Sequence, residues 1–288
     1  MSEYIDGDDL DLDFDAAATG MATGMATGMA TGVGDGFVDM PDRLDLLLVE
    51  SGVVGTRTKA QKLIKAGKVT VNGVTVTKPA YAVGSLGHAR IRVDKGEDYV
   101  SRGAYKLVGA FDAFREQGLT GPEGLECLDI GASTGGFCDV LLRRGAKRVI
   151  ALDVGHGQLD PRIADDPRII EMSGVNIRDV YVDDLPYRPH MIVSDVSFIS
   201  LTYVIPVIAR IAAPGAQVVL LVKPQFEVGR DGLGRNGIVA SEELRRKALD
   251  DVVACAKREG FDVIATAPSP IEGTHGNAEW LLYACTGQ

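Results

Sequence analysis

The chain of 288 residues contains only four cysteines, and no two of them form a C-x-x-C pair. This scarcity argues against a disulfide framework and is typical of reduced thiols in a cytosolic protein. No basic segment precedes an apolar run near the start, so a secretory signal peptide is not expected. The longest strongly apolar stretches, such as Val218–Val222, are far too short to cross a bilayer. We therefore expect a cytoplasmic protein with no membrane partner.

Lysine and arginine are absent from residues 1–40, which hold nine acidic residues. These nine account for most of the net charge of −10, so the acidic balance does not argue against a nucleic-acid partner. The same segment repeats Ala-Thr-Gly-Met between Ala18 and Gly32. Small residues, glycine and charge of one sign cannot bury enough surface to offset the entropy lost on ordering. We therefore predict a disordered acidic low-complexity tail over residues 1–40.

Residues 41–98 carry ten Lys or Arg against six Asp or Glu and predict a small α+β domain. Arg43–Ser51 predicts a short amphipathic helix, and Thr56 is placed to cap a second helix that runs to Ala66. Asn72-Gly73 is a strong hairpin signal between two short strands. A row of lysines on a helix is more often a solvated face than a binding site. Its concentration in so small a module favours contact with RNA phosphates.

This module, RLDLLLVESGVVGTRTKAQKLIKAGKVTVNG, resembles the S-four (S4) RNA-binding domain. The resemblance lies in RLD at the start, in Thr56-Arg57 before the second helix, and in the closing G-x-V-x-V-N-G. That family usually has serine before the arginine, and Thr56 keeps the hydroxyl cap. Such domains bind structured RNA by shape, which suits dispersed phosphate contacts without an aromatic platform. The candidate RNA-binding residues are Arg43, Arg57, Lys59, Lys62, Lys65, Lys68 and, beyond the module, Arg102.

From residue 99 onward, short apolar runs alternate with helical stretches. This alternation indicates an α/β fold with one doubly wound, Rossmann-like sheet of seven strands. No helix separates the last two strands, so an antiparallel hairpin is expected at the sheet edge. Residues 99–288 would form this second domain, with a linker at about 96–101. The predicted strands are Leu125–Ile130, Arg148–Val154, Ile169–Met172, Met191–Asp195, Gln217–Lys223, Phe261–Ala265 and Trp280–Cys285; the predicted helices are one ending near Gln117, Gly136–Arg144, Leu201–Ile211 and Glu242–Glu259.

The first of these strands leads into a glycine-rich turn in LECLDIGASTGGF. Glycines let the backbone approach a ligand where the strand ends, although a plain strand-to-helix turn is the alternative. The turn is not the G-x-G-x-x-G dinucleotide fingerprint, because Ser133 stands where the second glycine belongs. Asp153, at the end of the second strand, can accept hydrogen bonds from both ribose hydroxyls of an adenosine-containing cofactor. Because the turn lacks the spacing that seats a pyrophosphate, S-adenosylmethionine is favoured over a nicotinamide dinucleotide.

Four charged residues are expected to meet at the carboxyl ends of the strands. Asp195 ends the fourth strand in SDVSF, and Lys223 ends the fifth in LVKPQFE. Lys106 lies ahead of the first strand, and Glu279 opens the last. Unpaired charge beside apolar runs is costly, so a buried structural ion pair is the alternative. Two lysines and two acids in one crevice can instead orient a hydroxyl and favour its deprotonation.

The motifs SRGAYKL, LDIGASTGGF, ALDVG, SDVSF, LVKPQFEVGR and GNAEW resemble the 2′-O-ribose RNA methyltransferases of the FtsJ class. Together with the S4-like module, residues 42–286 resemble the hemolysin A (TlyA) family of rRNA cytidine 2′-O-methyltransferases. The resemblance implies metal-free, in-line methyl transfer from S-adenosylmethionine to ribosomal RNA (16S, 23S or both), free or in ribosomal subunits. The implied catalytic tetrad is Lys106, Asp195, Lys223 and Glu279, and the implied cofactor-binding residues are Gly131, Ser133, Thr134, Gly135, Gly136, Phe137, Asp153 and Asn176.

Other functions remain open alternatives. A cytosine-carbon methyltransferase would place a nucleophilic cysteine near Asp195, and none is there. An exocyclic-amine methyltransferase would more typically carry Asn or Asp followed by Pro-Pro and an aromatic residue at that point. A non-catalytic RNA-binding or ribosome-assembly factor has no need of all four tetrad residues. The family name suggests a membrane-lytic haemolysin, but the sequence has no spanning or strongly amphipathic insertion segment. The sequence does not indicate the oligomeric state.

Overall fold

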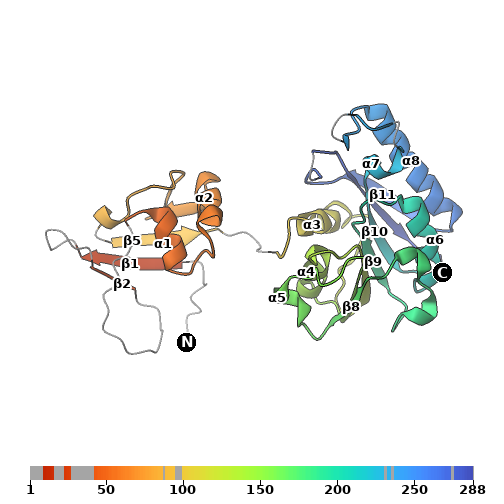
Figure 1. The fold of residues 1–288 in the computed structure, drawn as a ribbon, viewed down its shortest axis with the longest axis horizontal. Helices are drawn as coiled ribbons and strands as arrows, with labels where there is room; N and C mark the ends of the chain where they lie inside the picture. Colours follow the sequence, from red (N-terminus) through yellow and green to blue (C-terminus); the bar gives the residue numbers. More distant parts are fainter. Residues whose placement is uncertain are drawn as a thin grey trace. The chain divides into compact units, whose positions relative to one another are not determined.

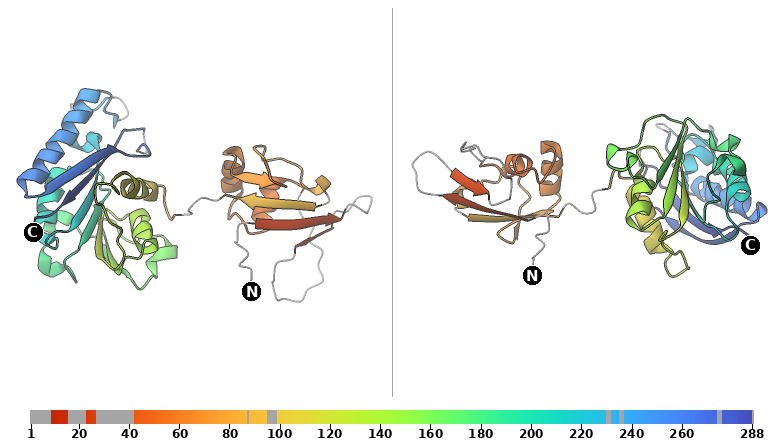
Figure 2. Two further views of the ribbon diagram at one scale, coloured as in Figure 1. Left: turned by 180° about the vertical axis from the view of Figure 1, so that it is seen from behind. Right: turned by 90° about the horizontal axis from the view of Figure 1, so that it is seen from below.

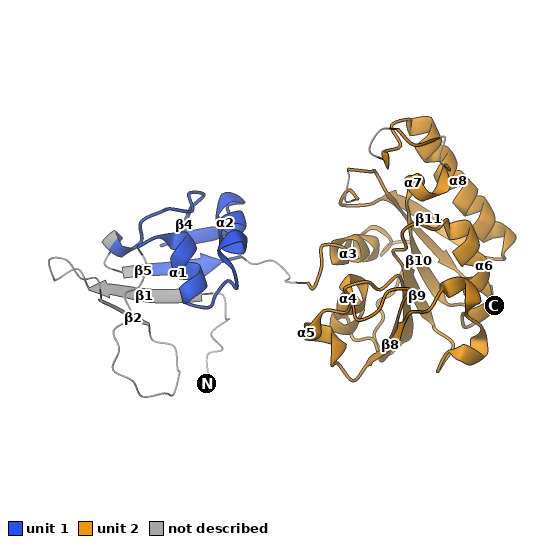
Figure 3. Cartoon of the chain, viewed as in Figure 1, with its two compact units in different colours: residues 1–98 blue, residues 99–288 orange. Residues whose placement is uncertain are grey.

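The structure is a computed structural model that describes residues 9–15, 23–26, 42–86, 88–94, 99–229, 232–234, 237–273 and 276–287. The chain divides into two compact units, Met1–Asp98 and Tyr99–Gln288 (Figure 3). Each unit buries a hydrophobic core of its own. The two units are described separately below.

In the first unit, α1 (Leu44–Glu50) and α2 (Arg57–Lys65) contribute to one core with an antiparallel sheet (Figure 1). Helix α2 begins where the Thr56 hydroxyl accepts a hydrogen bond from the Lys59 backbone N–H at 3.3 Å. Asn72 and Gly73 have positive φ angles of 50° and 79°, as the centre of a type I′ hairpin turn requires. The sheet order is β2-β1-β5-β3-β4, with β3 at Val69–Val71, β4 at Val74–Thr75 and β5 at His88–Val93; a 3₁₀ turn, η1, spans Gly84–Leu86.

Two strands lie inside the segment predicted to be a disordered tail. β1 (Asp9–Asp15) pairs antiparallel with β5, and β2 (Thr23–Ala26) pairs with β1. These two stretches are therefore paired as strands, and the disorder of the tail as a whole stays a prediction. The sequence of β1, DLDLDFD, alternates acidic and apolar residues with the period of a strand, a signal that overall composition hides. The rest of residues 1–40, and residues 96–98 of the predicted linker, lie outside the described residues.

The second unit contains the predicted seven-stranded α/β sheet, which is confirmed, in the order β11-β12-β10-β9-β6-β7-β8. Strand β12 runs antiparallel to both of its neighbours, and β10, β9, β6, β7 and β8 are mutually parallel. The predicted antiparallel hairpin at the sheet edge is thus the β11–β12 pair. The strand bounds are β6 Glu126–Ile130, β7 Arg148–Asp153, β8 Ile169–Ser173, β9 Met191–Ser194, β10 Gln217–Val222, β11 Asp262–Pro268 and β12 Trp280–Cys285.

Helices cover both faces of this sheet (Figures 1 and 2). α3 (Ala104–Ala113) and α4 (Gly136–Arg143) bury Phe111 and Leu141 in the core on one face. α6 (Leu201–Ile211) and α8 (Glu242–Arg258) bury apolar residues in the core on the other. α3 ends at Ala113, before the predicted Gln117, and turns follow it, in which the Gln117 N–H donates to the carbonyl of Phe114 and the Gly118 N–H to the carbonyl of Arg115. The short elements are α5 (Pro161–Ala164), η2 (Ile177–Asp179), η3 (Val182–Asp184) and α7 (Pro224–Glu227).

None of the helices in the described ranges combines the length and the apolarity needed to cross a bilayer. The longest of them, α8, is amphipathic: Leu249 and Val252 are buried, whereas Arg246 and Asp250 are exposed and form an ion pair with each other. Its apolar stripe is therefore already used by the core of the second unit.

Candidate active site

The site lies where neighbouring parallel strands end together. β10, β9, β6 and β7 are adjacent and parallel, so the segments that follow them leave from the same edge of the sheet. Because β12 is antiparallel, its beginning lies at that edge as well, where Trp280 pairs with Val222. Glu279 therefore lies near Lys223, although the two are far apart in the chain. The same edge carries the glycine-rich turn after β6 and Asp153 at the end of β7.

The four predicted tetrad residues form one chain of alternating charge. Lys106, from the first turn of α3, lies with its Nζ atom 2.8 Å from Glu279 Oε2 and 3.4 Å from Asp195 Oδ2. The Nζ atom of Lys223 lies 2.6 Å from Asp195 Oδ1. Both lysines and Glu279 are buried, with 5 to 8% of their surface exposed. Each charge thus has an opposite partner, which offsets part of the cost of removing it from water.

Three cavities that share some of their lining residues lie around this cluster. The first, about 310 Å³, lies between the tetrad and the glycine-rich turn. The second, about 770 Å³, extends past the ends of β6 and β7, and the third, about 840 Å³, lies on the other side of the two lysines. Of the predicted cofactor residues, Gly131, Ser133, Thr134, Gly136 and Phe137 line the first cavity, and Gly131, Ser133, Asp153 and Asn176 line the second.

In the glycine-rich turn, the backbone at Gly131 and at Gly136 lies so close to neighbouring segments that a side chain would not fit. Gly131 has a φ of 85°, and a Cβ atom there would lie 3.1 Å from the carbonyl oxygen of Asp195. At Gly136 a Cβ atom would lie 2.2 Å from Ser101 Oγ. Gly135 lines neither of the first two cavities, and its role in cofactor binding stays a prediction. Its missing side chain instead makes room for Ile163, whose Cδ1 atom would be 2.2 Å from a Cβ atom there.

Asp153 and Asn176 have local partners as well as a place in the second cavity. Asp153 accepts hydrogen bonds from the backbone N–H of Ser133 at 2.9 Å and of Gly155 at 2.8 Å. A carboxylate offers about four acceptor positions, so about two remain for a ligand. Asn176 caps η2 by accepting from the backbone N–H of Arg178 at 3.1 Å. Asp153 therefore both shapes the glycine-rich turn and presents acceptors to the cavity.

Asp129, Ser197 and Phe198 are among the lining residues that the sequence analysis did not single out. Asp129, inside β6, is fully buried and accepts hydrogen bonds from the backbone N–H and the thiol of Cys138, both at 3.1 Å. Burial raises the pKa of Asp129 to about 7. Ser197 accepts a hydrogen bond from Lys223 Nζ, and Phe198 is 92% exposed with a φ of 65°. The sequence contained one signal for Asp129, because a charged residue inside an otherwise apolar strand indicates a functional or paired group. It contained no such signal for Ser197 or Phe198.

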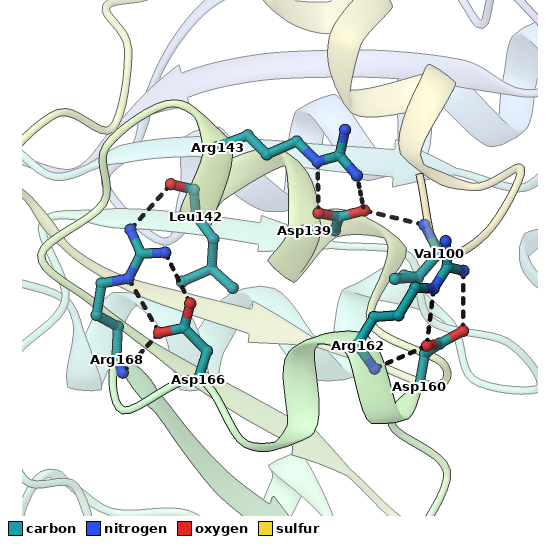
Figure 4. A network of polar contacts seen from close by, with 8 residues as sticks. All are labelled: Val100, Asp139, Leu142, Arg143, Asp160, Arg162, Asp166 and Arg168. Carbon is teal, nitrogen blue, oxygen red and sulfur yellow. Dashed lines mark hydrogen bonds and ion pairs between the residues drawn. The ribbon is translucent and has the colours of Figure 1, made fainter. Parts of the chain in front are cut away.

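A polar network anchors the start of the second unit to the helix after the glycine-rich turn (Figure 4). Asp139 on α4 accepts hydrogen bonds from the Val100 backbone N–H at 2.9 Å and from Arg143 Nε at 2.7 Å. The Arg143 guanidinium also lies 4.7 Å from the centre of the Tyr99 ring. The segment that leads to Arg102 and Lys106 is therefore fixed relative to the first cavity, which Arg102 lines.

In the first unit, two predicted RNA-binding arginines surround a buried aspartate. Arg43 and Arg57 donate to Asp45 at 3.0 and 3.1 Å, and Gln61 donates at 2.8 Å. Burial opposes ionisation of Asp45, but these hydrogen bonds prevail and hold its pKa well below the usual range. Both arginine side chains remain about half exposed, at 43% and 53%. Arg43 and Arg57 therefore have a structural role. The exposed part of each side chain is also accessible to a ligand in solution, and RNA binding by these arginines stays a prediction.

The remaining predicted RNA-binding residues of the first unit lie on α2 and just after it. Lys62, Lys65 and Lys68 are exposed, and Lys59 is half-buried. Lys68 forms an ion pair with Asp94. Binding of RNA by these residues stays a prediction.

The chain matches the FtsJ-like methyltransferase family over residues 99–285 and the S4 domain over residues 42–87. It belongs to the FtsJ-like methyltransferase family. This FtsJ-like methyltransferase is 41% identical over 244 residues to the 16S/23S rRNA (cytidine-2′-O)-methyltransferase TlyA of Mycobacterium tuberculosis, covering 85% of this chain and 90% of the relative. It is 41% identical over 245 residues to Hemolysin A of Brachyspira hyodysenteriae, covering 84% of this chain and 98% of the relative.

A solved structure of a candidate hemolysin from Streptococcus thermophilus is 39% identical, with a TM-score of 0.64, and the match covers 86% of this chain and 90% of that one. The predicted resemblance to FtsJ-class enzymes and to the hemolysin A (TlyA) family, with an S4 domain, is therefore confirmed. As an FtsJ-like methyltransferase, the protein is an enzyme.

Proposed function

We propose that the protein transfers a methyl group from S-adenosylmethionine to the 2′-hydroxyl of a cytidine in ribosomal RNA. The observation that carries this proposal is the alternation Glu279–Lys106–Asp195–Lys223 beside the glycine-rich turn. The cluster can position and deprotonate a hydroxyl, and the adjoining cavities leave room for a donor and an acceptor. The choice of cytidine and of 16S or 23S rRNA rests on the name of the relative from Mycobacterium tuberculosis.

The residues of the first two cavities fit a cationic adenosine derivative. The Oδ1 atom of Asp129 is buried and has no hydrogen-bond partner among the described residues, so the first cavity offers a carboxyl oxygen that a donor group of the ligand would satisfy. Asp153 offers acceptors for ribose hydroxyls in the second cavity. S-adenosylmethionine would therefore lie along Asp129, Gly131, Ser133 and Asp153. When bound, it supplies a methyl group activated by a positively charged sulfonium.

On the acceptor side, the residues of this chain hold and deprotonate the ribose hydroxyl. Asp195 and Lys223 bind the hydroxyl, and Lys223, acting as the neutral amine, receives the hydroxyl proton on its nitrogen lone pair as the oxygen attacks the methyl carbon in line and the bond from that carbon to sulfur breaks. Lys106, which contacts both acids, keeps Asp195 and Glu279 in place and completes the wall of the cavity. No metal is required in this scheme, because alignment and charge placement lower the barrier.

The third cavity suits a nucleotide withdrawn from a stack. Phe198 and Phe226 line it, with ring centres 5.2 Å apart, and the Phe198 side chain is almost fully exposed. An enzyme that acts on one nucleotide of folded RNA gains by stacking the displaced base on an aromatic side chain. The lysines of α2 in the S4 domain would supply the sequence-independent phosphate contacts.

Methyl transfer to ribosomal subunits tests the proposal. Purified protein is incubated with labelled S-adenosylmethionine and with subunits from cells that lack the enzyme, and 2′-O-methyl groups are then mapped. Lys223→Ala is expected to reduce the rate by about 100-fold or more, because it removes the proton acceptor. Lys247→Ala, at an exposed i,i+4 ion pair on α8, is the matched control. RNA that is bound but left unlabelled by the unmutated protein would favour a non-catalytic RNA-binding factor instead.

A further inference from the structure

Ser197 lies where the three cavities meet. It is the one described residue that lines all of them. On the proposed function, the first two cavities hold the methyl donor and the third holds the acceptor nucleotide. Transfer has to occur at a point that both substrates reach, so a side chain shared by all three walls lies next to the reacting atoms.

The Ser197 hydroxyl has a specific partner in this position. Lys223 Nζ donates a hydrogen bond to Ser197 Oγ at 2.9 Å and forms its ion pair with Asp195 at 2.6 Å. An ion pair with one carboxylate fixes the position of an amine but leaves its rotation about the Cε–Nζ bond free. A second acceptor, two residues further along the same turn, removes that freedom. The neutral amine that acts as base has two hydrogens and one lone pair, so with Ser197 and Asp195 as the partners of the hydrogens the lone pair remains for the acceptor hydroxyl.

The turn that carries Ser197 is held at both ends. At its start, the backbone N–H of Asp195 donates to the carbonyl of Ile130 at 3.2 Å. At its end, Glu227 accepts hydrogen bonds from the Ser200 hydroxyl at 2.5 Å and from the Leu201 backbone N–H at 2.9 Å. Between these anchors, Phe198 adopts a φ of 65°, which non-glycine residues rarely adopt. Such strain persists only where the surroundings determine the backbone, so the Ser197 hydroxyl is held in place by the fold.

We propose that Ser197 is a positioning residue for methyl transfer. Its hydroxyl sets the rotation of the Lys223 amine, so that the free position on Nζ faces the ribose hydroxyl in the third cavity. This inference rests on the proposed function and extends it by a fifth side chain, which acts through Lys223 rather than on either substrate. A purely structural hydroxyl would affect folding and substrate binding instead of the rate of the chemical step.

The test compares Ser197→Ala, Ser197→Thr and a control, Ser241→Ala, which removes the hydroxyl that caps α8. kcat and KM are measured with S-adenosylmethionine and with ribosomal subunits, next to the thermal unfolding midpoint of each variant. Loss of the hydrogen bond from Lys223, which leaves a buried donor without its partner, should lower kcat about tenfold to a hundredfold in Ser197→Ala. Both KM values should stay within about twofold, since uniform binding is unaffected. Ser197→Thr, which keeps a hydroxyl, should recover most of kcat.

Two results separate this inference from the proposed function. Unchanged kcat in Ser197→Ala, or a raised KM at unchanged kcat, would overturn the positioning role while the proposed function stands. Equal loss in Ser197→Thr and Ser197→Ala, with unfolding midpoints lowered together, would also overturn it, because the effect would then be structural. Absence of methyl transfer by the unmutated protein would overturn the proposed function, and the inference with it.

Discussion

Replacing Asp129 with asparagine should remove a pH dependence from the stability of the second unit. Asp129 is fully buried in β6, and burial, opposed by its hydrogen bond from the Cys138 thiol, raises its pKa from 3.8 to about 7. A carboxyl whose pKa is raised by folding binds more protons in the native state than in the unfolded state. Its contribution to stability is therefore complete below pH 3.8 and is lost as the pH rises to about 7.

The magnitude follows from the width of that interval. Between pH 5 and pH 7 the native state holds up to one extra proton, which falls to about one half at pH 7, so two pH units at about 1.4 kcal/mol each give a loss of roughly 2–3 kcal/mol. Asparagine keeps an acceptor for the Cys138 backbone N–H but does not titrate in this range. Any constant cost of the substitution cancels when the two proteins are compared at both pH values.

Urea unfolding at pH 5 and pH 7, followed by the fluorescence of Trp280, measures this difference. Trp280 is the single tryptophan of the chain and lies in β12, so it reports on the second unit. From pH 5 to pH 7 the free energy of unfolding should fall by about 2–3 kcal/mol more in the unmutated protein than in Asp129→Asn. Asp262→Asn, at an exposed aspartate on β11, is the control and should keep the dependence of the unmutated protein. Parallel pH profiles for Asp129→Asn and the unmutated protein would refute the reasoning.

Three other changes test the remaining parts of the site. Replacing both Lys62 and Lys65 with alanine should weaken the salt dependence of rRNA binding. In filter binding, the slope of log affinity against log salt concentration should decrease in magnitude by about 0.9 for each phosphate that is no longer neutralised. An unchanged slope would show that α2 does not contact the RNA. Phe198→Ala should raise KM for ribosomal subunits about tenfold, because base stacking is worth about 1–3 kcal/mol; an unchanged KM would remove Phe198 from the acceptor side. Gly136→Ala should destabilise the protein by about 1–3 kcal/mol in thermal unfolding, because its Cβ atom would collide with Ser101.

The sequence predicted the second unit well because its strands are continuous apolar runs. Residues such as Val218–Val222 are buried on both faces of the sheet, so burial, strand length and chain order all indicate one topology. The expectation that Asp195 and Lys223 would meet followed from the rule that parallel strands end at one edge. The partnership of Glu279 with Lys106 depends on the antiparallel direction of β12, which the missing helix before it indicated.

What the sequence did not reveal depends on contacts between distant segments. No local pattern distinguishes Gly135, which accommodates Ile163, from Gly131, which lies against the Asp195 backbone. The contact of Ser197 with Lys223 likewise exists only once β9 and β10 are adjacent. The strand Asp9–Asp15 was missed for a different reason, because its period of two was present but was outweighed by the composition of its surroundings.

The placement of β12 has a consequence for how this enzyme folds during its synthesis. β12 is inserted between β10 and β11, both of which precede it in the chain. Until residues 280–285 have been synthesised, β10 presents an open backbone edge and β11 has no neighbour to pair with. A nascent chain that stops short of β12 therefore lacks both the strand that joins the sheet and the placement of Glu279, so premature termination yields a defective fold rather than a weakly active enzyme.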